Sequence, residues 1–266
     1  MPERAIGVFD SGVGGLTVLK ELRRQIPGEK LIYLGDTARV PYGTKSATTV
    51  LRYAHEAARF LLEQKVKLLV VACNTASAVA LEGLVEAYQV PVVGVIEPGA
   101  RRAIEVSVNG RIGVVGTEGT IRSGAYERAL RRERADVVVH TAACPLFVPL
   151  AEEGWAGHEV ARLTAREYLA PLLAEGIDTL VLGCTHYPLI KPMLQEIVGP
   201  QVRLVDSAQE TAKAVAAQLK THRLQGQGQP VSTPRYFVTD IPDRFERVGG
   251  AFLGEPLQGV TTVSLD

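Results

Sequence analysis

The sequence is poor in cysteine and has no long apolar run. Its 266 residues include three cysteines, none of which belongs to a Cys-x-x-Cys pair. This usage argues against a disulfide framework, a zinc knuckle or a thioredoxin-like site. No segment approaches the ~18 consecutive apolar residues that a membrane helix needs, and residues 1–5 show no apolar signal region. We therefore expect a cytoplasmic protein without a membrane partner.

An excess of charge of either sign is also lacking. Lys plus Arg and Asp plus Glu number 29 each. A nucleic-acid partner usually requires a basic excess, so none is expected. The shares of hydrophobic residues, 46%, and of charged residues, 22%, are typical of a folded globular protein. The length allows one large domain or two of ordinary size.

The familiar phosphate-binding motifs are missing as well. The glycine-rich segment 12–15 has neither the G-x-G-x-x-G spacing of a dinucleotide site nor the Gly-Lys-Ser/Thr of a P-loop. No lysine stands out as an anchor for pyridoxal phosphate. The residues therefore indicate no nucleotide, pyridoxal phosphate or metal site. The glycine segment can still present backbone N–H groups to a carboxylate at the start of a helix.

The sequence does contain alternating apolar runs and helical patterns. Strands are predicted at 6–9, 31–34 and 68–72, helices at 16–24 and 48–64, and a loop at 35–43. Apolar runs separated by helices are typical of parallel strands that are buried on both faces. Ligands bind beyond the carboxyl ends of such strands. The residues just after each run are therefore the candidates for chemistry.

The second half of the chain repeats the first. Apolar runs at 6–8, 31–33, 69–73 and 92–95 match runs at 112–114, 137–139, 180–184 and 203–206 in the same order. A repeat of this length indicates a duplicated domain. The predicted fold class is α/β, with two pseudo-symmetric three-layer domains, mostly parallel sheets and the active site in the cleft between them.

The C-terminal stretch does not fit the second copy. Residues 235–238 and 260–265 look like strands, and residues 225–234 like a surface loop rich in Gly, Gln and Pro. We expect this stretch to return to the first domain. The predicted first domain is residues 1–97 plus 208–266, and the predicted second domain is residues 98–207.

Cys73 and Cys184 occupy equivalent positions in the two copies. Each follows a predicted strand and precedes an expected helix start, a position that lowers the pKa of a thiol. Two thiols that face each other across a cleft can remove a proton from one side of a carbon and deliver one to the other, as inversion of a stereocentre requires. Their sulfurs are then expected roughly 6–8 Å apart with substrate bound and unbonded. Cys144 lacks such flanks, so we assign it a structural role away from the pair.

Several polar residues lie where they can support the thiols. Asp10 and Asp36 end the first two predicted strands and can orient a thiol or relay a proton, although either can equally be a helix or loop cap. His186 is two residues from Cys184 and can help keep it ionised, or it can be an ordinary surface histidine. Glu152 is a weaker candidate. Neutral donors for a substrate carboxylate are Asn74, Thr75 and Thr185.

Taken together, the motifs resemble the glutamate racemases of the cofactor-independent aspartate/glutamate racemase family from end to end. The matching segments are 9–18, 33–43, 71–77, 94–98, 116–123, 144–149 and 183–188. The two cysteine segments are shared with aspartate and hydantoin racemases, whereas the first two segments are typical of glutamate racemases. The resemblance implies an isomerase that interconverts L- and D-glutamate and supplies D-glutamate for peptidoglycan, hence for cell wall biogenesis and cell shape.

The resemblance also implies roles for individual residues. Cys73 would act on D-glutamate and Cys184 on L-glutamate. The supporting acid/base positions are Asp10, Asp36, Glu152 and His186, and the substrate-binding positions are Asp10, Ser11, Tyr42, Gly43, Asn74, Thr75, Thr185 and His186. The family usually forms homodimers, so a homodimer is expected.

Two alternatives stay open at this point. A racemase of aspartate or another small amino acid would use the same thiol pair on a different side chain. A two-lobed α/β binding protein would share the cleft, but it would have no need for a thiol in each lobe.

Overall fold

The computed structural model describes residues 2–226 and 233–265, and the rest of the predicted loop at 225–234 lies outside the described residues. The first part of the chain forms β1 (Ile6–Asp10), α1 (Leu16–Gln25), β2 (Leu31–Gly35), the 3-10 helix η1 (Tyr42–Thr44), α2 (Ala47–Glu63), β3 (Leu68–Val71), α3 (Asn74–Ala87) and β4 (Val92–Gly94).

The second part forms α4 (Ile96–Val106), β5 (Arg111–Gly116), α5 (Glu118–Arg122), α6 (Ala125–Glu133), β6 (Val138–Ala143), α7 (Phe147–Glu152), α8 (Glu159–Ala174), β7 (Thr179–Gly183), the 3-10 helix η2 (Tyr187–Ile190), α9 (Lys191–Val198) and β8 (Arg203–Asp206). The chain ends with α10 (Ser207–Thr221), β9 (Arg235–Val238), α11 (Pro242–Leu253) and β10 (Val260–Thr262).

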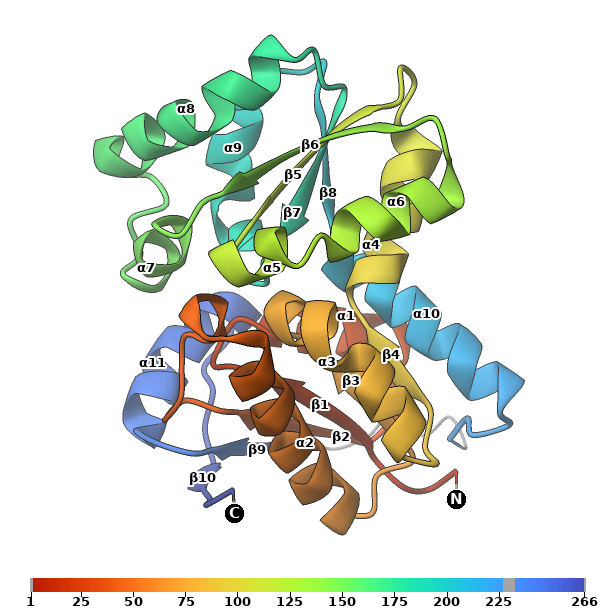
Figure 1. Ribbon diagram of the computed structural model, residues 1–266. Helices are drawn as coiled ribbons and strands as arrows, with labels where there is room; N and C mark the ends of the chain where they lie inside the picture. The colour runs from red at the N-terminus through yellow and green to blue at the C-terminus, as the bar shows by residue number, and fades with distance from the viewer. Residues whose placement is uncertain (1, 227–232, 266) are drawn as a thin grey trace.

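These elements build two lobes, each a parallel sheet between layers of helices (Figure 1). The sheet of the first lobe has the order β10-β9-β2-β1-β3-β4, and that of the second lobe has the order β6-β5-β7-β8. The order β2-β1-β3-β4 therefore recurs as β6-β5-β7-β8, which confirms the predicted α/β class with two related halves. The chain after α10 returns to the first sheet, where β9 pairs with β2. The exact domain boundaries stay a prediction.

Helix α2 shows why the local sequence folds as predicted. Ser46 caps its start by accepting a hydrogen bond from the Thr49 backbone N–H at 3.2 Å. The buried residues of this helix recur at helical spacing, and they are Val50, Ala54, Ala57, Ala58 and Leu61. The helix ends at Glu63, and Lys65 then turns the chain with a φ of 59°. A single apolar face against the sheet thus fixes the helix.

Helices α4 and α10 are exchanged between the lobes. α4 follows β4 of the first sheet but packs on β7 and β8 of the second. α10 follows β8 of the second sheet but packs on α1 and β4 of the first. One hydrophobic cluster accordingly runs from Ile6 in the first lobe to Val181 in the second. The two lobes share a core at this crossing.

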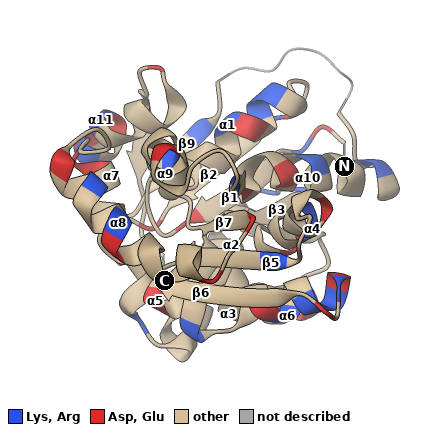
Figure 2. Ribbon diagram, turned by 90° about the horizontal axis from the view of Figure 1, so that it is seen from above, with Lys and Arg blue, Asp and Glu red and all other residues tan. Residues whose placement is uncertain are grey.

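The surface carries charges of both signs. Figure 2 shows basic and acidic residues following one another along α1, α6 and α8, in keeping with the balanced composition. Within residues 2–226 and 233–265, the structure has no helix with the length and apolar character needed to cross a membrane.

Candidate active site

Asp10 lies at the carboxyl end of β1, between the lobes. Its side chain is 1% exposed. The Gly12 N–H donates to its Oδ2 at 2.9 Å, and the Thr185 hydroxyl of the second lobe donates to its Oδ1 at 3.4 Å. Burial raises the pKa of Asp10, and the opposing influence of His186 and the Gly12 amide is smaller. The glycine turn was expected to bind a substrate carboxylate, but its Gly12 N–H already donates to the Asp10 carboxylate.

Cys73 caps the N-terminus of α3. Its Sγ accepts a hydrogen bond from the Ala76 N–H at 3.5 Å and lies 3.8 Å from the Ser11 hydroxyl. The prediction that this position lowers the thiol pKa is wrong. Burial raises the pKa of Cys73 to about 12, helped by the negative charge of Asp10, and the effect of the Ala76 amide is smaller. Cys73 is therefore a neutral thiol at physiological pH, ready to donate a proton.

Cys184 has a different environment. The helix start expected directly after it is absent, because η2 begins only at Tyr187 and α9 at Lys191. The Cys184 Sγ instead lies 3.8 Å from Nδ1 of His186, whose Nε2 lies 3.0 Å from Oε1 of Glu152. A protonated imidazole beside a sulfur stabilises the thiolate. The two thiols thus differ. Cys73 has a raised pKa, and Cys184 has an imidazole beside its sulfur.

The charge state of His186 follows from its neighbours. Burial opposes protonation of the ring, but the hydrogen bonds to Cys184 and Glu152 outweigh it and raise the pKa of His186 to about 10. For Glu152, burial again opposes the charge, but His186 and Arg244 outweigh it and lower the carboxyl pKa. Cys184, His186 and Glu152 therefore form a line of charge-assisted contacts, here called the relay.

The relay predicts a loss of stability in mild alkali. A histidine whose pKa is raised on folding stabilises the protein fully below its unfolded pKa of about 6.5 and loses that contribution as the pH rises through the folded value. We expect the free energy of unfolding, measured with urea, to fall between pH 6.5 and 9 by more in the wild type than in His186→Asn. Cys73 adds to the loss only above its ordinary pKa of 9.0.

His222 gives the matched control for this experiment, because it is exposed near the end of α10. His222→Asn should follow the wild-type curve. A slope between pH 6.5 and 9 that is the same in His186→Asn and the wild type would contradict the charged state assigned to His186.

The three cysteines are unbonded, as expected. The charge of Cys184 contributes to the raised pKa of Cys73, so the two sulfurs lie within electrostatic range across the lobes. The expectation that Cys144 lies away from the pair is wrong, since the charge of Cys184 also adds to the raised pKa of Cys144, about 12, which burial mainly causes. Cys144 is fully buried in the core of the second lobe. The distance between the sulfurs of Cys73 and Cys184 with substrate bound stays a prediction.

Asp36 organises the loop that follows β2. Its fully buried carboxylate accepts from Arg39 Nε at 2.7 Å, from the Thr239 hydroxyl at 2.9 Å and from the Tyr42 hydroxyl. Tyr42 in turn lies within electrostatic range of Cys73, whose charge adds to the raised pKa of the phenol, after burial and Asp36. The structure thus links Asp36 to the thiol through Tyr42. A direct part in proton transfer stays a prediction.

Three threonine hydroxyls meet where the lobes touch. The Thr75 hydroxyl lies 2.9 Å from that of Thr117 and 3.2 Å from that of Thr120. Thr117 directly follows β5, as Ser11 directly follows β1, and Thr120 lies in α5 just beyond it. No role was predicted for Thr117 or Thr120. The repeat that relates 6–8 to 112–114 was the signal in the sequence that could have pointed to Thr117. We add both hydroxyls to the candidate binding residues.

Gly43 and Asn74 complete the neighbourhood of these hydroxyls. A Cβ at Gly43 would lie 2.5 Å from the Thr117 Cβ, so only glycine allows this contact. Asn74 accepts from the Tyr126 hydroxyl at 2.7 Å, and its buried Nδ2 has no protein partner within the described part of the chain. A buried amide donor without a partner costs stability unless a ligand satisfies it. The Asn74 amide therefore has a donor that a ligand oxygen could accept from, and its part in substrate binding stays a prediction.

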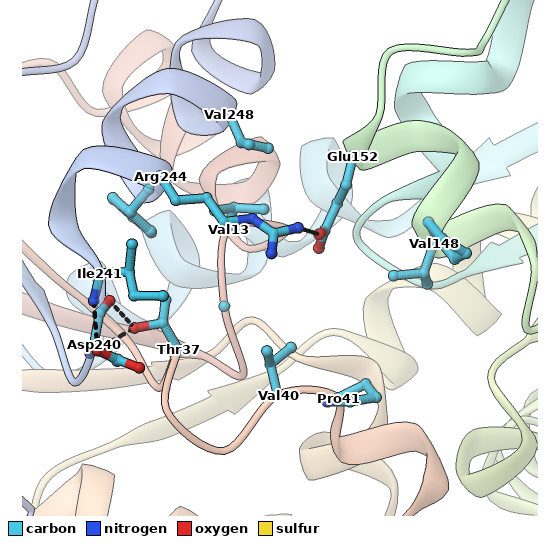
Figure 3. Close-up of a pocket in the computed structure, with 13 residues that line it drawn as sticks. Val13, Thr37, Val40, Pro41, Val148, Glu152, Asp240, Ile241, Arg244 and Val248 are labelled. Carbon is cyan, nitrogen blue, oxygen red and sulfur yellow. Dashed lines mark hydrogen bonds and ion pairs between the residues drawn. The ribbon is translucent and has the colours of Figure 1, made fainter.

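A cavity of about 350 Å³ opens beside the relay (Figure 3). Val13 and Val248 line it from the first lobe, and Val148 and Glu152 from the second. Neither Cys73 nor Cys184 lines it. The cavity therefore gives access to the Glu152 end of the relay and not to the sulfurs directly.

Each lobe is a parallel sheet, and in each a thiol follows the carboxyl end of the equivalent strand. This arrangement is typical of a two-lobed α/β racemase. The sequence profile of the Asp/Glu/Hydantoin racemase family matches residues 6–215. The chain belongs to this family, which makes it an isomerase and confirms the resemblance drawn from the motifs.

Within the family, the chain is similar to glutamate racemases. That of Geobacter metallireducens is 60% identical over 266 residues, covering 100% of this chain and 98% of that protein. A crystal structure of a glutamate racemase isoform from Bacillus anthracis has a TM-score of 0.96 at 41% identity, covering 100% of this chain and 99% of that one. A structure from Francisella tularensis, in complex with D-glutamate, has a TM-score of 0.92 at 39% identity with the same coverage. An aspartate racemase of Picrophilus torridus, 17% identical with a TM-score of 0.55, shares the fold alone.

Proposed function

We propose that the protein interconverts L- and D-glutamate by two-base proton transfer at the α carbon. The observation that carries this proposal is the unequal surroundings of the two thiols: Cys73 lies beside the Ser11 hydroxyl, and Cys184 lies 3.8 Å from Nδ1 of His186. One acid and one base on opposite sides of a carbon are what inversion requires. The similarity to glutamate racemases over the whole chain supports glutamate as the substrate.

In the forward direction, the Cys184 thiolate takes the α proton of L-glutamate, and the C–H electron pair stays on the carbon. The Cys73 thiol then delivers its proton to the opposite face, which gives D-glutamate and leaves Cys73 ionised. The reverse reaction starts from that state. His186 faces the Cys184 sulfur during the transfer and Glu152 fixes the ring, since a histidine bound at one nitrogen has a defined orientation. Asp10 lies within electrostatic range of Cys73 and accepts a hydrogen bond from Thr185, the neighbour of Cys184 in the chain, so it can relay a proton between turnovers.

Most of the groups proposed to hold the substrate are hydroxyl, amide and backbone groups. The residues proposed to bind it are Asp10, Ser11, Tyr42, Gly43, Asn74, Thr75, Thr185 and His186, together with Thr117 and Thr120. Ser11 lies 3.8 Å from the Cys73 sulfur and Thr185 lies next to Cys184 in the chain, so both flank the reacting carbon. Hydroxyl and amide groups fixed before the reaction stabilise charge that develops on the substrate carboxylate during it.

The wider role follows from this activity. We place the enzyme in the cytoplasm, because three free thiols persist in a reducing compartment. There it would supply D-glutamate for peptidoglycan. Assembly as a homodimer is part of the same proposal and rests on the resemblance to the family.

The decisive experiment is incubation of the purified protein with L-glutamate in deuterated water, with a chelator present and without pyridoxal phosphate. We expect deuterium at the α carbon together with D-glutamate, at a rate that neither the chelator nor added pyridoxal phosphate changes. Aspartate in the same assay tests the remaining alternative, a racemase of another small amino acid. Exchange with aspartate but not glutamate would favour that alternative, and exchange with neither would refute the proposal.

A further inference from the structure

Helix α11 of the first lobe contacts the relay of the second lobe. Arg244 on α11 donates to Oε2 of Glu152 at 3.0 Å (Figure 3). Oε1 of the same carboxylate faces His186 at 3.0 Å. About two turns further on, Phe252 of α11 meets the His186 ring edge to face, with ring centroids 5.3 Å apart. Two residues of the C-terminal tail therefore touch two members of the relay.

We propose that Arg244 is a positioning residue that makes proton transfer at Cys184, but not at Cys73, depend on contact between the two lobes. This inference rests on the proposed function and deepens it. The partners of Cys73, Ser11 and Ala76, belong to the first lobe as Cys73 does. The relay of Cys184 is instead completed from the opposite lobe.

The ion pair between Arg244 and Glu152 is partly exposed to solvent, so it can orient the carboxylate without fixing the lobes together. Glu152 has 17% of its side chain exposed and Arg244 has 51%, with Glu153 as a second, more distant partner at 3.9 Å. An arginine bound to one carboxylate oxygen leaves the other directed at the imidazole. Without contact between the lobes, Arg244 no longer orients Glu152. The His186 ring then loses its aligned partner Glu152 and its ring contact with Phe252. The thiolate of Cys184 is then less well held.

The platform that carries Arg244 is rigid. Phe245 and Val248 of α11 are buried against the first lobe, and a Cβ at Gly249 would lie 2.8 Å from Leu16 of α1. The helix is therefore fixed to the first lobe, whereas Glu152 belongs to the second. Arg244 therefore reaches Glu152 only when the two lobes are in contact, because α11 belongs to the first lobe and the relay to the second.

The test needs a reaction in which each thiol works alone. Racemisation does not serve, because enantiomers have equal free energies and kcat/KM must then be the same in both directions. Elimination from L- and D-glutamate analogues with a leaving group at the β carbon is irreversible and needs a single proton abstraction. Cys73→Ser and Cys184→Ser establish which analogue each thiol processes.

We expect Arg244→Gln to slow elimination from the Cys184-dependent analogue by about fivefold, the size of effect that a partly exposed ion pair supplies, and to leave the other analogue unaffected. Arg244→Lys should restore most of the loss, since it keeps the charge. Arg247→Gln, on the same helix and exposed, is the matched control and should behave as the wild type.

The rates of elimination from the two analogues support or overturn the proposed role of Arg244. Equal slowing of both analogues by Arg244→Gln would indicate a merely structural role and overturn the inference, as would no slowing of either. Processing of neither analogue by the wild type would refute the proposed function itself, and the inference with it.

Discussion

Serine in place of either cysteine is expected to abolish racemisation and to spare one half of the chemistry. A hydroxyl is a far poorer base than a thiolate at neutral pH, and a missing acid–base group typically costs about 10²- to 10⁴-fold. Cys73→Ser should still eliminate from the L-analogue through Cys184, and Cys184→Ser from the D-analogue through Cys73. Chiral chromatography of glutamate and release of the leaving group measure the two activities.

Cys144→Ser is the control for both variants. Cys144 is buried, but its Sγ already lies 3.7 Å from the Ala142 carbonyl, so a serine hydroxyl at this position has an acceptor. Turnover should be nearly intact in this variant. Full racemisation by Cys73→Ser or Cys184→Ser would end the two-base mechanism.

Gly14→Ala should lower kcat for racemisation about 10²-fold, because a displacement of about 1 Å at a catalytic group has an effect of that size. A Cβ at this position would lie 2.6 Å from Nδ1 of His186, the atom that faces Cys184, and closer still to the Thr185 hydroxyl. The imidazole must move, and the contact with the sulfur is lost. Steady-state kinetics with L-glutamate, beside a thermal melt, separate this effect from unfolding.

Gly157→Ala is the matched control, because a Cβ there meets no atom within 4 Å. It should leave kcat unchanged. Normal turnover by Gly14→Ala would show that the backbone of the glycine turn can shift, and that the close approach to His186 is not required.

The fold and the thiol pair were predictable because their signals are local. The apolar runs that became β1, β2 and β3, and the spacing that became α2, depend on periodicities within one segment. The equivalence of Cys73 and Cys184 depended on a repeat that is visible in the sequence. Most of the strand order and the return of the C-terminal tail then follow from the rules for parallel sheets.

What could not be predicted depends on contacts distant in the chain. The pKa of Cys73 was expected to be lowered by its place before a helix, but burial between two lobes outweighs that local effect. The proximity of Cys144 to Cys184, and the contact of Arg244 with Glu152, join residues that no local pattern relates. The repeat indicates that Thr117 is equivalent to Ser11. Only the structure shows that its hydroxyl contacts that of Thr75.

The exchange of α4 and α10 bears on how this chain holds together. Each sheet is covered in part by a helix that the other half of the sequence supplies, so neither half can bury its apolar surface alone. A fragment cut between the two copies would expose one sheet face and lack its cover. The two halves of this sequence are therefore expected to fold only in each other's presence, each supplying the helix that the other sheet needs.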